Sequence, residues 1–216
     1  MKNTLFILSF LFTLSSWAVE YYPCEITYED GRTEILEVQF PIDNSNPKLR
    51  VKIDGKRASL QKDNIKFFTI SLNNDEDKYL FLGGREYSKR GRKKRKVFTL
   101  VERVTESGIV IGNLGLAYNV GREKDSDKDI IVFTYLQAHR TYSFSRQNEE
   151  IIYPIINYTF GPGLKYYYRK TAEKYQPTLF PDCPDISDLI DYDSIKNKGV
   201  GTVIEAYEEC VGTNNE

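Results

Sequence analysis

Short segments of alternating apolar and polar residues, closed by Asp-Gly turns, constrain the fold of this chain more than any other feature. Ile26 and Tyr28 alternate with polar residues before Asp30-Gly31, and residues 35–40 return after the turn. The stretch 48–60 repeats the pattern around a second Asp-Gly pair. Asp-Gly suits a tight hairpin because glycine tolerates a positive φ. These two stretches predict two β-hairpins near the start of the chain.

The same pattern continues to about residue 146. Short runs rich in Val, Ile, Tyr and Phe alternate with polar turns and predict strands over 65–72, 78–84, 96–106, 109–119, 129–139 and 141–146. Strands at this spacing indicate an antiparallel sheet, sandwich or barrel. We therefore expect a β-rich region over residues 19–170.

The C-terminal part has a different periodicity. In the stretch 181–193, Pro184 lies near a helix start, and the apolar residues after it recur at helical spacing. In the stretch 201–211, Val203, Tyr207 and Cys210 fall on one helical face. We predict an α+β protein in which residues 171–216 form two short helices packed on the β-rich region.

The first eighteen residues have the composition of a secretory signal peptide. Lys2 gives a positive start, an apolar run follows over residues 5–14, and Ser16 and Ala18 supply small residues before the expected cleavage point. The apolar run is too short for a membrane-spanning helix, which needs about twenty residues. Cys24 follows "YYP", which is not the context of a lipid-anchored cysteine. We expect an exported protein, periplasmic, outer-membrane-associated or extracellular, that begins at Val19.

Charge and cysteine content limit the function classes. Removal of residues 1–18 takes away one of the 30 Lys and Arg and none of the 31 Asp and Glu, which leaves a net charge of about −2. Nucleic-acid-binding domains are usually basic overall, so no nucleic-acid partner is expected. Three cysteines in an exported chain favour one disulfide and one remaining thiol, and the residues alone leave the pairing open.

A dense basic run separates two of the expected strands. Seven of eight consecutive residues are cationic: Lys89, Arg90, Arg92, Lys93, Lys94, Arg95 and Lys96. Like charges at this density favour a solvated hairpin tip. The alternative is a site for an extracytoplasmic anion, such as lipopolysaccharide or an acidic polysaccharide. Stacking aromatic residues, which single-stranded nucleic acid requires, are absent from within the run.

Signals for catalysis or metal binding are weak. His139 is the only histidine and has no nucleophile motif around it. Asp125, Asp127 and Asp129 have the spacing of the first calcium-loop ligands, but the required Gly and Glu further along the loop are absent. We assign no catalytic residue, no metal ligand and no cofactor. A hydrolase that uses two carboxylates needs no motif, so it stays open as a third hypothesis after a structural or binding role and a polyanion or glycan binder.

Tyrosine is abundant, with sixteen in the chain. The run Tyr166, Tyr167 and Tyr168 is typical of core and amphipathic surface, and exposed rings there would also suit stacking on a glycan. The triplet Asp193-Ser194-Ile195 is similar to a bacterial O-glycan acceptor.

Both ends of the mature chain carry a resemblance. The stretches "PCEITYEDGRTEILEVQF", "KDNIKFFTI", "LFPDCPDISDLI" and "VIEAYEEC" resemble a group of uncharacterised secreted proteins from Bacteroidota-type bacteria. Ile186 stands where that group usually has Leu, and "YEEC" replaces its usual last motif. The resemblance implies an envelope or extracellular location and a Cys183–Cys210 disulfide, with no implied activity. Cys24 would then stay unpaired and pack against the sheet.

Overall fold

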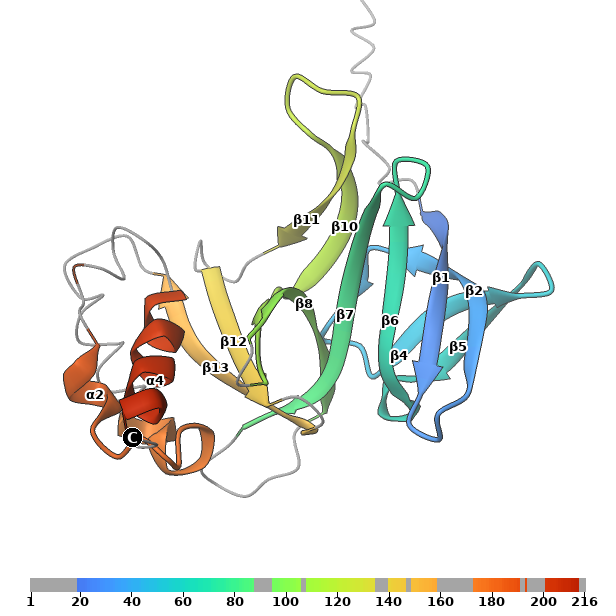
Figure 1. The fold of residues 1–216 in the computed structure, drawn as a ribbon. Helices are drawn as coiled ribbons and strands as arrows, with labels where there is room; N and C mark the ends of the chain where they lie inside the picture. Colours follow the sequence, from blue (N-terminus) through green and yellow to red (C-terminus); the bar gives the residue numbers. More distant parts are fainter. Residues whose placement is uncertain are drawn as a thin grey trace, which may run out of the picture.

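The computed structural model describes residues 19–87, 95–105, 108–134, 140–146, 149–158, 173–190, 193 and 201–213. Within these ranges the protein is β-rich with short helices near its C-terminus, so the α+β prediction is confirmed (Figure 1). The expected signal peptide, His139, the three consecutive tyrosines and Ser194 lie outside the described residues.

Ten strands form one long sheet in the order β13-β12-β9-β8-β7-β6-β1-β2-β4-β5. Their bounds are β1 Glu20–Tyr28, β2 Thr33–Phe40, β4 Lys48–Ile53, β5 Lys56–Gln61, β6 Ile65–Leu72, β7 Asp77–Glu86, β8 Lys96–Val104, β9 Ile109–Asn113, β12 Arg140–Arg146 and β13 Ile151–Tyr158. A second, three-stranded sheet has the order β11-β10-β3, with β3 Ile42–Asp43, β10 Ala117–Arg122 and β11 Asp129–Thr134.

Both predicted Asp-Gly hairpins are present. Strands β1 and β2 pair around Gly31, and β4 and β5 pair around Asp54 and Gly55. Asp54 has a φ of 51° and Gly55 a φ of 73°, the two positive values that a type I′ turn requires. This two-residue turn sets Lys52 opposite Arg57 and Arg50 opposite Ser59.

Part of the long sheet closes on itself. Strand β13 pairs antiparallel with β12 and parallel with β7, so the strands β7, β8, β9, β12 and β13 form a ring. The parallel contact is short and sets Ile151 and Ile152 beside Arg85 and Glu86. The strand pattern of the sequence does not predict β13.

The stretch 109–119 is not the single strand that its sequence predicts. It breaks at residues 114–116 into β9, in the long sheet, and β10, in the small one. The backbone at the break bonds to distant partners: Leu114 N donates to Thr141 O, and Gly115 O accepts from the side chain of Asn44. Asn44 is buried and also exchanges hydrogen bonds with both backbone groups of Phe98 at 2.8 Å, which ties the two sheets together.

The helical part is more divided than expected. Residues 173–179 form a helix that the sequence does not predict, α2 covers only Ile186–Leu189, and α4 covers Gly201–Thr213. The predicted apolar face of α4 is confirmed, because Val203 and Tyr207 are buried. None of the helices within the described residues is long and apolar enough to cross a membrane.

Two apolar cores form within the described residues. One lies between strands of the N-terminal half and includes Phe40, Phe68 and Phe81, with Phe68 and Phe81 stacked at 4.6 Å between ring centroids. The other joins Ile111 and Phe144 of the ring to side chains of the helical part. Figure 1 places α2 and α4 beside β12 and β13, at the opposite end of the molecule from β4 and β5.

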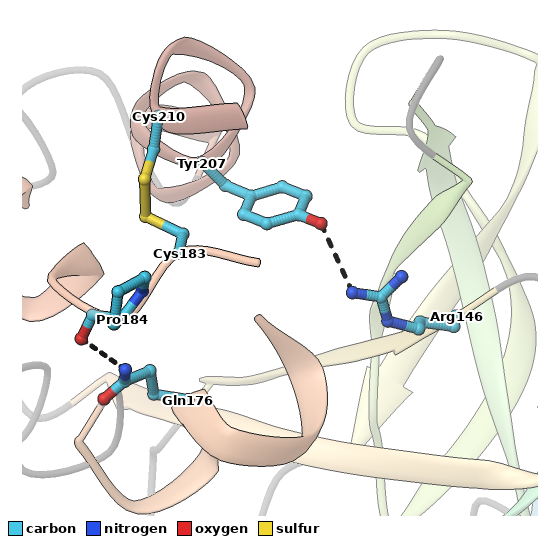
Figure 2. The surroundings of a disulfide bond; sticks show 6 residues. All are labelled: Arg146, Gln176, Cys183, Pro184, Tyr207 and Cys210. Carbon is cyan, nitrogen blue, oxygen red and sulfur yellow. Dashed lines mark hydrogen bonds between the residues drawn. A yellow bond between two sulfur atoms is a disulfide. The ribbon is translucent and has the colours of Figure 1, made fainter. Parts of the chain in front are cut away.

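A disulfide joins the helical segments. Cys183 and Cys210 are bonded, with their Cα atoms 6.0 Å apart, as the resemblance implied (Figure 2). Arg146 of β12 donates to Leu179 O at 2.9 Å and to the hydroxyl of Tyr207 at 3.3 Å. Cys24 is free and buried in the other core, where burial raises the pKa of its thiol to about 12. The disulfide joins the helical segments to each other, and the bonds from Arg146 hold them against the ring.

Candidate anion-binding surface

Most of the predicted basic run lies outside the described residues, which resume at Arg95 and Lys96. Lys96 begins β8 with its side chain buried, and its ammonium group donates to the carboxylate of Glu29. The side chain lies across Gly83, where a Cβ would come within 3.0 Å of Lys96 Cε. The charge of Lys96 is therefore neutralised inside the fold. Arg95 is exposed and donates from Nη1 to Ser45 O at 2.7 Å.

The aspartate spacing that resembles a calcium loop falls on the turn between β10 and β11. Asp125 and Asp127 are exposed, and Asp127 lies 3.7 Å from Arg122. In the described part of the chain, no three His, Cys, Asp or Glu side chains gather in an arrangement that could hold a metal ion.

The strongest concentration of unpaired positive charge that the structure describes lies on β4 and β5. Leu49 and Val51 of β4 are buried, so alternation sends Lys48, Arg50 and Lys52 to the opposite face. On β5, Ala58 and Leu60 pack against the N-terminal core, and Arg57 is exposed on the outer face with Ser59. We call the outward set Lys48, Arg50, Lys52 and Arg57 the cationic strand face.

The hairpin register brings these charges close together. Lys52 is paired with Arg57, and Arg50 is two residues from Lys52 along β4, which is about 7 Å in an extended strand. Like charges directly opposite each other destabilise a strand pair. The two strands together contain five Lys and Arg and no Asp or Glu. This arrangement is unfavourable for the isolated protein and favourable for a bound anion.

One acid partly compensates the face. Glu37 of β2 accepts from Lys52 Nζ at 3.1 Å, and the same ammonium group lies 4.2 Å from the centroid of the Tyr21 ring. Among the described residues, Arg50, Arg57 and Lys48 have no ion pair and no side-chain hydrogen bond. Three of the four cations are therefore available to a ligand.

Two hollows adjoin the cationic strand face. The first, which we call the arginine hollow, has a volume of about 300 Å³ and is lined by Tyr21, Gln39, Arg50, Arg57, Ala58 and Ser59. The second has about 180 Å³; it shares Gln39 and Arg50 with the first and adds Lys48, Asp43 and Asn46. Because Gln39 and Arg50 line both, the two hollows are neighbours on the outer face of β2 and β4. We call the pair of hollows the track.

The described end of the basic run lies beside this track. Ser45, which accepts the hydrogen bond from Arg95, is held by its own bonds to Asp43, with Ser45 Oγ donating to Oδ2 at 2.7 Å. Asp43 lines the second hollow. Two basic segments that are separate in the sequence therefore meet at the loop between β3 and β4.

A third hollow contains carboxylates and bears on the hydrolase hypothesis. It has a volume of about 240 Å³ and a mainly apolar lining that includes Phe67, Leu82 and Val101. Three acids also line it: Glu29, Glu149 and Glu150. Glu29 is paired with Lys96, and Glu150 accepts from Arg85 Nε at 2.8 Å. Two of the three acids are thus held by cations, and this hollow gives no support to a pair of catalytic carboxylates.

Comparison with protein-family models, with curated proteins and with solved structures finds no match.

The cationic strand face is not among the sites that the sequence predicts, although part of its signal is local. The stretch 48–60 shows its cations at every second position, Lys48, Arg50 and Lys52, in register with the apolar residues that predict the strand. That alternation is the available signal. The pairing with Arg57 and the contribution of Tyr21 and Gln39 depend on how the sheet folds.

Proposed function

We propose that this chain is an exported, non-catalytic protein that binds an anionic polymer outside the cytoplasm through the cationic strand face. Acidic polysaccharide and the charged part of lipopolysaccharide are the ligand classes that fit the expected location. The observation that carries the proposal is the set of unpaired cations that β4 and β5 direct into two adjoining hollows.

Arg95, at the described end of the basic run, adds one charge to the same site. It contacts the loop that borders the second hollow. Polyanion binding through Lys and Arg is salt-dependent, because each neutralised charge releases counterions. Several neutralised charges would make affinity fall steeply as salt rises, without requiring selectivity for a base sequence.

The test is retention of mature protein, residues 19–216, on immobilised heparin, lipopolysaccharide and single-stranded DNA across a salt series. A variant with Arg50→Glu and Arg57→Glu should elute at clearly lower salt from the ligand that binds. The slope of log affinity against log salt should become shallower, because fewer ligand charges are neutralised and fewer counterions are released. A second variant measures how much the basic run contributes to binding. It changes Arg92, Lys93, Lys94 and Arg95 to Ser.

The matched control carries Lys78→Glu and Arg103→Glu, which make the same change in net charge at exposed strand positions away from the face. Equal weakening in this control and in the Arg50/Arg57 variant would assign the binding to overall charge and contradict the proposed site. Elution of the wild type at low salt from every column would contradict polyanion binding itself.

A further inference from the structure

The lining of the arginine hollow indicates which anionic polymer it suits. We propose that the arginine hollow is a sugar subsite and that the ligand is an acidic polysaccharide whose rings carry carboxylate or sulfate groups. This inference rests on the proposed function and adds to it the class of ligand and the side chains that select it.

The two cations in the hollow are both arginines. Arg50 and Arg57 come from neighbouring strands, both line the hollow, and neither has a partner among the described residues. A guanidinium group presents a planar fork of donors that binds an oxyanion through two parallel hydrogen bonds, which an ammonium group cannot do. The hollow therefore has the donors to orient an anionic group as well as attract it.

The remaining lining suits a sugar ring. Lys52 covers one face of the Tyr21 ring, so a sugar would stack on the other face. Ser59 and the amide NH₂ of Gln39 are neutral hydrogen-bonding groups of the kind that match hydroxyls. Tyr21 is held in place, because its hydroxyl donates to Gln39 Oε1 at 3.2 Å and Lys52 lies over its ring. A side chain that is already fixed loses less entropy when a ligand binds.

The same lining argues against two other kinds of ligand. The acyl chains of a lipid need an apolar pocket, and Ala58 is the one aliphatic side chain in the lining. Single-stranded nucleic acid needs a series of stacking rings, and Tyr21 is the one aromatic side chain there. The volume of about 300 Å³ is at the lower end of small-molecule sites, which suits one sugar ring with its charged group.

The charge on β5 could also serve to protect an edge strand, and the test must distinguish this role from sugar binding. Strand β5 is the last strand at one end of the long sheet, and charged side chains on such strands prevent edge-to-edge aggregation. Charges of either sign serve that purpose, and lysine serves as well as arginine. Sugar binding instead requires the arginine forks and the ring of Tyr21.

The second hollow gives room for the next sugar units of a polymer that is bound in the arginine hollow. It shares Gln39 and Arg50 with the arginine hollow and places Lys48 further along β4. Its lining also includes one acid, Asp43, whose carboxylate accepts from Ser45 Oγ. Lys48 and Arg50 are two residues apart on one strand face, about 7 Å. A chain of charged sugars could therefore meet Arg57, Arg50 and Lys48 in turn.

The test compares four probes by titration at fixed salt: polygalacturonate, dextran sulfate, neutral dextran and polyphosphate. Polygalacturonate carries carboxylates on sugar rings, dextran sulfate carries sulfates, and polyphosphate has charge without rings. We expect wild-type protein to bind one or both charged polysaccharides at least tenfold more tightly than polyphosphate of matched charge, and not to bind dextran.

Three variants keep the net charge. Arg50→Lys with Arg57→Lys should weaken binding to the charged polysaccharide about tenfold, and Tyr21→Leu about fivefold, with polyphosphate affinity nearly unchanged. Tyr21→Phe keeps the ring and should retain most of the affinity, which guards against a simple folding defect in Tyr21→Leu.

Equal affinity for polyphosphate and polysaccharide, or indifference to both conservative changes, would overturn the sugar subsite and leave the proposed function in place. Failure to bind any of the charged probes would overturn the proposed function as well.

Discussion

Lys62 is a buried lysine whose charged form the fold disfavours. Its side chain is buried, its ammonium group donates to Asp43 O at 2.8 Å, and it lies 5.1 Å from the centroid of the Phe98 ring. Burial lowers the pKa of Lys62 to about 8; the nearby Asp43 carboxylate opposes this change and Arg95 adds to it.

This pKa predicts a stability that depends on pH. An unfolded lysine titrates near 10.4, so between about pH 8 and 10.4 the unfolded chain binds more protons than the folded one. The free energy of unfolding therefore gains from Lys62 as pH rises through this window, by on the order of 3 kcal/mol in total. Urea denaturation at pH 7, 9 and 10.5 should show that the free energy of unfolding of the wild type, relative to that of Lys62→Met, increases with pH. The exposed Lys56→Met gives the baseline, and parallel curves for Lys62→Met would refute the assignment.

The roles of some single residues cannot be predicted from the sequence. Lys96 belongs in sequence to a solvated basic run, yet the start of β8 turns its side chain inward to Glu29, 67 residues earlier. Asn44 looks like an ordinary loop residue, yet it satisfies buried backbone groups of Phe98 and Gly115. Both roles depend on partners that only the folded sheet brings together.

At the level of elements, local turn chemistry is enough to predict the hairpins and distant pairing is not. The Asp-Gly turns define β1–β2 and β4–β5, because positive φ at Gly31 and Gly55 is a property of the residue itself. Strand β13 contains Pro154, which usually argues against a strand. Pro154 is accommodated opposite Ser143, next to the register shift in β12, a site that no local pattern reveals.

The disulfide is the element-scale contact with the largest expected effect. It joins the segment before α2 to α4 across a sequence separation of 27, and closing a loop of this length stabilises a fold by about 3.5 kcal/mol in the chain-entropy description. Cys210→Ser should lower the free energy of unfolding by about 3 kcal/mol, measured by denaturant titration. Reductant should destabilise the wild type similarly and leave Cys210→Ser unchanged. Further destabilisation of that variant by reductant would show that another bond is involved.

For the whole molecule, total charge is a poor guide to function. The chain is nearly neutral, with 30 basic and 31 acidic residues, while β4 and β5 have five cations and no acid. A near-neutral composition therefore gives no sign of a general nucleic-acid binder, and it cannot locate a cationic face. The alternation in the stretch 48–60 contains three of the four cations of the face, Lys48, Arg50 and Lys52, but does not by itself indicate a site. The contribution of β1 and β2 follows only from the sheet order.

The expected export of the whole chain can be tested together with its cysteines. Full-length protein made in a secreting bacterial host should lose residues 1–18 and begin at Val19, as measured by intact mass. Alkylation should then label no thiol in the native protein, one after denaturation and three after denaturation with reductant. The first value follows because Cys24 is buried and burial raises its thiol pKa to about 12, and the second because Cys183 and Cys210 are bonded.

Each unexpected labelling or mass result would contradict a different part of the prediction. A labelled thiol in the native protein would contradict the closed core around Cys24, since thiol reagents attack the thiolate and need access to it. Three labelled thiols without reductant would show that the pair does not form during export. A mass that still includes residues 1–18 would contradict signal-peptide cleavage, and with it the extracytoplasmic ligand classes on which the proposed function depends.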